Sequence, residues 1–92
     1  MFSQRADLLC FNRIMWVEKD NQLVGSFEFD DFVEAFAFMT QVAIVSEKLN
    51  HHPDWTNVYN KIEIRLSTHD EGNVVTTKDR ELAAIIESIY HR

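Results

Sequence analysis

Two adjacent histidines, His51 and His52, are the residues of this sequence best suited to chemistry. They lie in the stretch EKLNHHPDW, between a run with helical periodicity and Pro53. A residue before proline is pushed away from helical geometry, so we expect the helix to end near Asn50 or His51. Both imidazoles then follow a helix C-terminus, whose partial negative charge favours the protonated ring. Because imidazole titrates near neutral pH, the pair suits general acid–base catalysis.

Two simpler interpretations of these histidines stay open on the residues alone. One histidine at a helix end commonly caps the last carbonyl groups, but two adjacent side chains point apart and do not share that task. A metal site is the other interpretation, and its ligand types would come from Glu47, His51, His52 and His69. Their spacing matches no helical HExxH pattern, and adjacent histidines rarely bind one ion, so we expect no metal.

Other side chains of chemical interest have both an ordinary and a functional interpretation. The indoles of Trp16 and Trp55 are either core residues or a stacking wall for a flat ring. Glu47, one turn before His51, is either a solvated helix residue or orients a histidine. His69 comes at the end of the polar face of an expected strand. It is either part of a site with the paired histidines or an ordinary surface residue.

The N-terminal third of the chain predicts a β-hairpin. Residues 13–18 favour a strand, KDNQ at 19–22 is a turn signal, and residues 23–29 carry apolar side chains at one parity. Before the hairpin, residues 3–11 are expected to form a short helix capped by Ser3.

The clearest helix is expected over residues 32–49. Asp31 can cap it, and Glu34 three residues later completes a capping-box pattern. Its apolar residues form two lines, one with Phe36, Thr40 and Ile44, the other with Phe38, Val42, Val45 and Leu49. A helix that packs on a sheet needs only one apolar stripe. The second stripe is therefore either buried as well or meets another subunit.

Residues 55–69 have the alternation of β-strands. Ile62, Ile64 and Leu66 alternate with polar residues, so one face is expected to be buried and the other wet. A tight turn at residues 60–61 would split the segment into two strands, and one unbroken strand is the alternative.

The C-terminal segment predicts a loop and a final helix. DEGN at 70–73 is typical of a loop, and residues 76–90 carry one apolar helical face. Thr76 can cap that helix with Asp79 as the capping-box carboxylate. The order ββαββα predicts an α+β fold over residues 1–92: a two-layer single domain, with a four-stranded antiparallel sheet and helices on one face.

Length and composition agree with a single globular domain, since 92 residues are 46% hydrophobic and 26% charged. A net charge of −6 without a Lys/Arg cluster argues against direct nucleic-acid binding. Cys10 is the sole cysteine, which excludes an intrachain disulfide and fits a reducing compartment. No segment approaches the roughly 18 apolar residues of a membrane span. We therefore expect a cytoplasmic protein with no membrane contact.

A wider pattern around the histidines resembles the signature of the pterin-4a-carbinolamine dehydratases. The matching residues, in their spacing, are Glu47, His51, His52, Pro53, Tyr59, His69 and Asp79. The likeness is strongest over residues 36–69 and extends over about residues 16–90, while the first 15 residues look shorter than in animal members. The family's fold is the one that the pattern of elements predicts.

The resemblance implies dehydration of 4a-hydroxytetrahydrobiopterin (pterin-4a-carbinolamine) to quinonoid dihydropterin, in tetrahydrobiopterin recycling beside an aromatic amino-acid hydroxylase. It implies catalysis by His51, His52 and His69, with the first and last as the acid–base pair and no metal or redox cofactor. It also implies a pterin-binding set, which consists of Glu47, Pro53, Trp16 and Trp55. Asp79 is expected to be structural, as a helix cap.

The resemblance also implies a homodimer or homotetramer assembled through the helix at 32–49. Animal members act as dimerisation cofactors of a homeodomain transcription factor through this helix, so a non-enzymatic protein-binding role is the main alternative. A dehydratase for a different pterin and a degenerate relative that serves in assembly are further alternatives. The presence of all three histidines argues against the degenerate relative.

Overall fold

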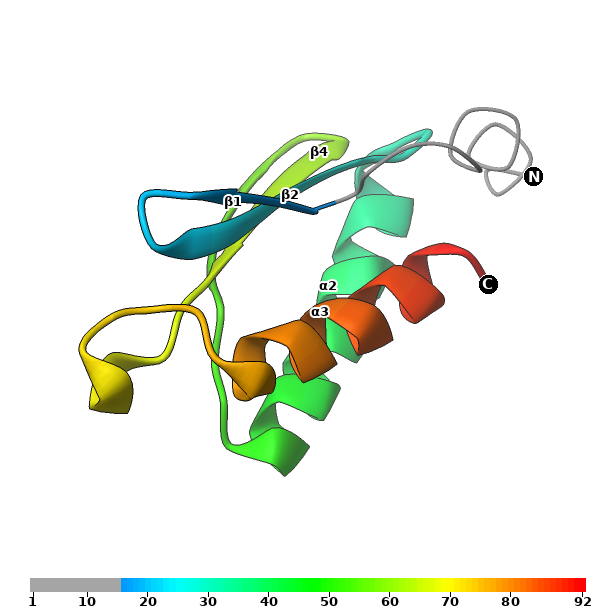
Figure 1. Cartoon of the computed structure of the whole chain (residues 1–92). Helices are drawn as coiled ribbons and strands as arrows, with labels where there is room; N and C mark the ends of the chain where they lie inside the picture. Colours follow the sequence, from blue (N-terminus) through cyan, green and yellow to red (C-terminus); the bar gives the residue numbers. More distant parts are fainter. Residues whose placement is uncertain (1–15) are drawn as a thin grey trace.

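The structure is a computed structural model that describes residues 16–92. In this part of the chain the elements follow the order ββαββα, with one 3₁₀-helix before the last α-helix (Figure 1). Their bounds are β1 Trp16–Lys19, β2 Gln22–Glu28, α2 Phe32–Leu49, β3 Asp54–Val58, β4 Lys61–Leu66, η1 His69–Glu71 and α3 Thr77–Tyr90. The helix expected over 3–11 lies outside the described residues.

The four strands form one antiparallel sheet in the order β1-β2-β4-β3. At its centre, Leu23 of β2 is paired with Leu66 of β4, and Phe27 with Ile62. Both helices lie on the same side of the sheet (Figure 1). The predicted two-layer α+β arrangement is therefore confirmed. None of the helices within residues 16–92 has the length and apolar character needed to cross a bilayer.

Tight turns connect β1 to β2 and β3 to β4. Asp20 and Asn21 both have left-handed backbone, with φ of 54° and 63°, which lets a two-residue turn follow the strand twist. The other turn lies at Tyr59 and Asn60, one residue before the expected position. Lys61 instead pairs with both neighbouring strands, which satisfies its backbone groups. The predicted split into two strands is confirmed, and the predicted turn position was wrong by one residue.

The N-terminus of α2 uses the predicted cap. Asp31 Oδ1 accepts a hydrogen bond from the Glu34 N–H at 2.9 Å. The Glu34 carboxylate accepts from the Asp30 N–H at 3.3 Å, one residue earlier than a capping box requires. The first turn of α2 is therefore fixed by two side chains on its own segment.

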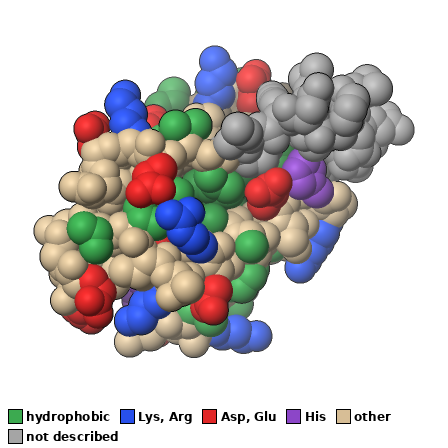
Figure 2. Space-filling model, viewed as in Figure 1, with side chains coloured by type: hydrophobic (Ala, Val, Ile, Leu, Met, Phe, Trp, Pro, Cys, Tyr) green, Lys and Arg blue, Asp and Glu red, His purple; other side chains and the backbone are tan. Residues whose placement is uncertain are grey.

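The core lies between the covered sheet face and the two helices. Its buried hydrophobic residues are Leu23, Phe27, Phe29, Ala35, Phe38, Val42, Ile62, Ile64, Leu66, Leu82, Ala83, Ile86 and Ile89. One expected stripe of α2 enters this core through Phe38 and Val42. The other does not, because Phe36 is 54% and Ile44 56% exposed. Figure 2 shows hydrophobic side chains among charged ones on one face of the surface.

The segment before α3 is more ordered than a plain loop. The 3₁₀-helix η1 begins at His69, and Gly72 ends it with left-handed backbone at φ 90°. Thr76 and Asp79 then form the predicted capping box at the start of α3. The Thr76 hydroxyl lies 2.7 Å from that of Thr68, so the start of α3 lies beside the residue that precedes His69.

Candidate active site

The three candidate histidines line one cavity of about 400 Å³, here called the histidine cavity. His51 and His52 come from the segment between α2 and β3, and His69 from η1 after β4. The complete lining is Asn50, His51, His52, Pro53, Asp54, Ser67, Thr68, His69, Asp70 and Lys78. Residues 18 positions apart in sequence therefore meet at one opening, and the volume lies in the range of small-molecule pockets.

The end of α2 sets the direction of the paired histidines. Asn50 is left-handed at φ 53°, and its N–H donates to the Glu47 carbonyl at 3.1 Å. The next N–H, that of His51, donates to the Ser46 carbonyl at 3.0 Å. These two bonds form a Schellman motif, which ends the helix and turns the chain toward Pro53. The helix end that Pro53 predicted is confirmed.

His51 is held by a buried carboxylate. Its Nε2 lies 2.6 Å from Asp79 Oδ1, with the imidazole only 12% exposed and the aspartate side chain fully buried. The interpretation of Asp79 as a cap alone was incomplete, because the same carboxylate caps α3 and binds a histidine. Sequence spacing showed the cap, whereas the partner 28 residues away depends on the tertiary fold.

A chain of hydroxyl groups completes the binding of Asp79. Thr68 Oγ1 donates to Asp79 Oδ2 at 2.7 Å, and the Thr76 N–H donates to the same oxygen at 2.9 Å. Because the single hydroxyl proton of Thr68 is donated to the carboxylate, Thr68 Oγ1 can only accept from Thr76. The Thr76 hydroxyl therefore donates to Thr68 Oγ1 at 2.7 Å. Both carboxylate oxygens of Asp79 are therefore supplied with donors.

These bonds keep Asp79 ionised. Burial alone would raise the pKa of the Asp79 carboxyl, but hydrogen bonds from His51, Thr68 and the Thr76 backbone outweigh burial and lower that pKa below its ordinary value. An ionised carboxylate only accepts, so His51 Nε2 carries the shared proton. The remaining ring nitrogen, His51 Nδ1, is the one left for a ligand.

The other two histidines have weaker partners. His52 Nε2 lies 2.9 Å from Glu47 Oε1, with the two side chains 57% and 80% exposed. His69 Nδ1 lies 2.6 Å from the amide oxygen of Asn73, in an exposed position. Within residues 16–92, no three His, Cys, Asp or Glu side chains form a group that could hold a metal ion.

The two tryptophans do not line the histidine cavity. The Trp16 indole packs edge-on against Phe27 and covers Gly25 so closely that a Cβ there would lie 2.9 Å from its ring. Trp55 lines a separate groove on α2 together with Glu47. Both indoles are partly buried and pack against the hydrophobic core, and their expected contact with a pterin stays a prediction. Of the expected pterin-binding set, Pro53 lines the histidine cavity.

Sequence reasoning missed two residues that hold the site. Thr68 has the same parity as Ile64 and Leu66, so continued strand alternation would have placed its hydroxyl on the buried side. Asn73 was expected only as part of a loop. Its φ of 60° agrees with the known tolerance of asparagine for left-handed backbone, but nothing in the sequence pointed its amide at His69.

Comparison with known proteins gives concordant similarities. The sequence model of the family described as Pterin 4 alpha carbinolamine dehydratase matches residues 3–89. A protein of Prochlorococcus marinus, provisionally named pterin-4-alpha-carbinolamine dehydratase, is 53% identical over 74 residues, which cover 80% of this chain and 76% of that protein. A crystal structure described as a transcriptional coactivator/pterin dehydratase from Brucella melitensis has a TM-score of 0.79 at 38% identity, covering 95% of this chain and 92% of that one.

A second solved structure shares the fold. It is a pterin dehydratase-like protein described as a RuBisCO assembly factor in the alpha-carboxysome, with a TM-score of 0.72 and 22% identity. The similarity covers 85% of this chain and 92% of that one. At this identity the likeness concerns the fold alone.

Proposed function

Because the chain belongs to the pterin 4 alpha carbinolamine dehydratase family, we propose that it dehydrates 4a-hydroxytetrahydrobiopterin to quinonoid dihydropterin. The observation that carries the proposal is the meeting of His51, His52 and His69 at one cavity. A bicyclic pterin is a small, flat and polar ligand, and a cavity of about 400 Å³ with mixed polar lining suits it.

The reaction needs two proton transfers. The C4a–O bond breaks, and its hydroxyl leaves as water after taking a proton. The N5 proton is lost, and its electron pair forms the C4a–N5 double bond. We assign these transfers to His51 and His69, which approach the cavity from different segments. A positioned acid or base typically contributes about 10² to 10⁴ in rate, and neither transfer requires an electron carrier.

The remaining residues have binding and positioning roles in this proposal. His52 binds the pterin at the opening, and Glu47 orients the His52 ring through the bond at 2.9 Å. Pro53 shapes the wall beside them. Asp79 acts through His51, since its carboxylate fixes which imidazole nitrogen carries a proton. We place this activity in the cytoplasm beside an aromatic amino-acid hydroxylase, whose product is the substrate.

A stopped-flow assay tests the proposal. Freshly generated 4a-hydroxytetrahydropterin is mixed with protein, and the ultraviolet change on dehydration is followed. The wild type is expected to accelerate the reaction, and a His51→Ala, His69→Ala double variant to lose at least about 10²-fold of that acceleration. His91→Ala, in a histidine outside the cavity lining, is the matched control and should keep wild-type turnover. A folded double variant with wild-type turnover would contradict the assignment.

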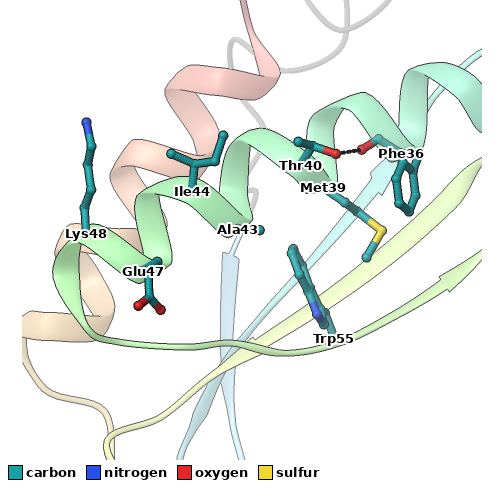
Figure 3. A pocket seen from close by; sticks show the side chains of 8 residues that line it. All are labelled: Phe36, Met39, Thr40, Ala43, Ile44, Glu47, Lys48 and Trp55. Carbon is teal, nitrogen blue, oxygen red and sulfur yellow. Dashed lines mark hydrogen bonds between the residues drawn. The ribbon is translucent and has the colours of Figure 1, made fainter.

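A second function is favoured by the exposed stripe of α2. A groove of about 540 Å³ runs along this helix, and its lining is Phe36, Met39, Thr40, Ala43, Ile44, Glu47, Lys48 and Trp55. Figure 3 shows Met39 pointing from α2 toward the Trp55 indole on β3. Exposed apolar patches of this kind mark protein contacts. We propose that α2 assembles the chain into a homodimer or homotetramer, with a non-enzymatic protein-binding role as the alternative use of the same surface.

Light scattering during size-exclusion chromatography tests the assembly. Ile44→Asp places a charge on the exposed stripe and is expected to lower the oligomeric mass, while Gln41→Asp on the same helix serves as an exposed polar control. An unchanged mass for Ile44→Asp would contradict assembly through α2. The stopped-flow assay separates the enzymatic from the non-enzymatic use, because only the former needs the histidines.

A further inference from the structure

We propose that Asn73 is a positioning residue for His69, an inference that rests on the function proposed above and names a further member of its site. The Asn73 amide oxygen lies 2.6 Å from His69 Nδ1. An amide oxygen only accepts, so Nδ1 carries the proton in this contact. His69 Nε2 is then the nitrogen with a free electron pair, which is the form that takes a proton from a bound substrate.

The backbone around Asn73 holds this contact in place. Its N–H donates to the Thr68 carbonyl at 3.0 Å, and the Gly72 N–H donates to the His69 carbonyl at 3.0 Å. Gly72 and Asn73 are both left-handed, with φ of 90° and 60°. Asparagine is one of the few residues other than glycine that adopts this backbone readily. Asn73 therefore closes the turn with its backbone and reaches back to His69 with its amide.

The partner of His69 differs in charge from the partners of the other two histidines. His51 and His52 each face a carboxylate, from Asp79 and Glu47. A carboxylate stabilises the imidazolium ion, whereas a neutral amide orients the ring without adding negative charge. Within the site, Asn73 thus leaves His69 as the histidine suited to accept the N5 proton, and His51 as the one suited to donate to the leaving hydroxyl.

Nuclear magnetic resonance of ¹⁵N-histidine-labelled protein tests this directly, because long-range ¹H–¹⁵N spectra distinguish the two tautomers of each ring. We expect wild-type His69 to be protonated at Nδ1 when neutral. Asn73→Gly removes the amide while tolerating the left-handed backbone, and it should lose this tautomer preference. Asn73→Asp keeps an oxygen acceptor and should retain it. Asn21→Gly makes the same substitution at left-handed backbone in the β1–β2 turn and should leave His69 unchanged.

Dehydration kinetics give the second readout. Asn73→Gly is expected to lower kcat/KM about tenfold, a part of the 10² to 10⁴ that a positioned base contributes. Asn73→Asp should recover part of that loss, and Asn21→Gly should match the wild type. If Asn73 had only a structural role, Asn73→Gly would leave the His69 tautomer unchanged. The Gly and Asp variants would then not differ in that tautomer.

Failure of this inference is distinguishable from failure of the proposed function. Protonation of wild-type His69 at Nε2, or an unaltered tautomer in Asn73→Gly, overturns the role of Asn73 even if the histidine double variant is inactive. If the wild type does not accelerate dehydration, the proposed function fails. The tautomer spectra then still decide whether Asn73 positions His69.

Discussion

Two histidine–carboxylate pairs at one cavity differ mainly in burial. His51 with Asp79 and His52 with Glu47 have similar separations, 2.6 and 2.9 Å. The first pair is enclosed by the protein and the second is open to water. Water competes for the exposed pair, whereas it has little access to the buried pair. At similar separations the buried pair therefore contributes more to the free energy of unfolding. The comparison teaches that the enclosed pair restricts the orientation of its ring more strongly than the open pair does.

The two pairs also differ in how the chain builds them. Glu47 and His52 are five residues apart, the first in the last turn of α2 and the second just beyond its end. Asp79 reaches His51 from α3 and is held by Thr68, which follows β4. The enclosed pair therefore depends on the packing of three segments, whereas the open pair depends on one. Substitutions at Asp79, Thr68 and Glu47 can separate these contributions.

Asp79→Ala is expected to have the largest effect. It removes bonds to His51, Thr68 and the Thr76 backbone at once, so the free energy of unfolding should fall by about 3 kcal/mol. Urea denaturation measures this loss. Glu81→Ala, an exposed acidic residue on the same helix, should change stability by less than about 0.5 kcal/mol. Equal losses in both variants would remove the distinction between buried and exposed partners.

Acid pH should weaken the enclosed pair selectively. The pKa of Asp79 is lower in the folded than in the unfolded chain, so its contribution is complete above the unfolded pKa of aspartate. That contribution is lost as the pH falls through the lower folded pKa. Thermal unfolding between pH 7 and pH 2 should therefore show a steeper acid loss for the wild type than for Asp79→Asn. Parallel curves would contradict an ionised Asp79.

Thr68→Val tests the hydroxyl chain behind the carboxylate. The change keeps the shape of the side chain but leaves Asp79 Oδ2 with one donor fewer, and it should cost about 1–2 kcal/mol. Thr68→Ser retains the hydroxyl and should recover most of that loss in the same denaturation assay. A serine variant as unstable as the valine variant would attribute the effect to packing of the methyl group.

Glu47→Gln should have the smallest effect on stability, below about 0.5 kcal/mol, because the His52 pair is exposed and screened. Glutamine keeps an acceptor for the His52 ring, so the pterin affinity measured by titration should also change little. If Glu47→Gln lowered the free energy of unfolding as much as Thr68→Val, solvent exposure would not determine how much the pair contributes to stability.

The sequence predicted the elements better than the contacts between them. Pro53 correctly predicted the end of α2, and alternation of Ile62, Ile64 and Leu66 predicted the covered face of the sheet. These features depend on local backbone preference and on periodicity. The joining of Asp79 to His51 could not be predicted in this way, because it needs the start of α3 to lie beside the end of α2.

Residues with two local interpretations marked the limit of prediction at the site. The resemblance implies that Trp16 and Trp55 lie near the pterin, which stays a prediction; the fold packs the first indole over Gly25 and the second beside α2. Thr68 and Asn73 carried no distinctive motif, although both hold the partners of histidines. An indole or a hydroxyl fits many surroundings, so only tertiary neighbours decide its role.

Asp79 both caps α3 and binds His51, so the local stability of α3 is coupled to the orientation of the His51 ring. The carboxylate that starts the helix also orients His51. Any fluctuation that frays the first turn of α3 therefore releases the imidazole in the same event. Hydrogen exchange at the amides of this turn would report the fraction of molecules competent to react, and a partly folded chain could not present a finished reaction centre.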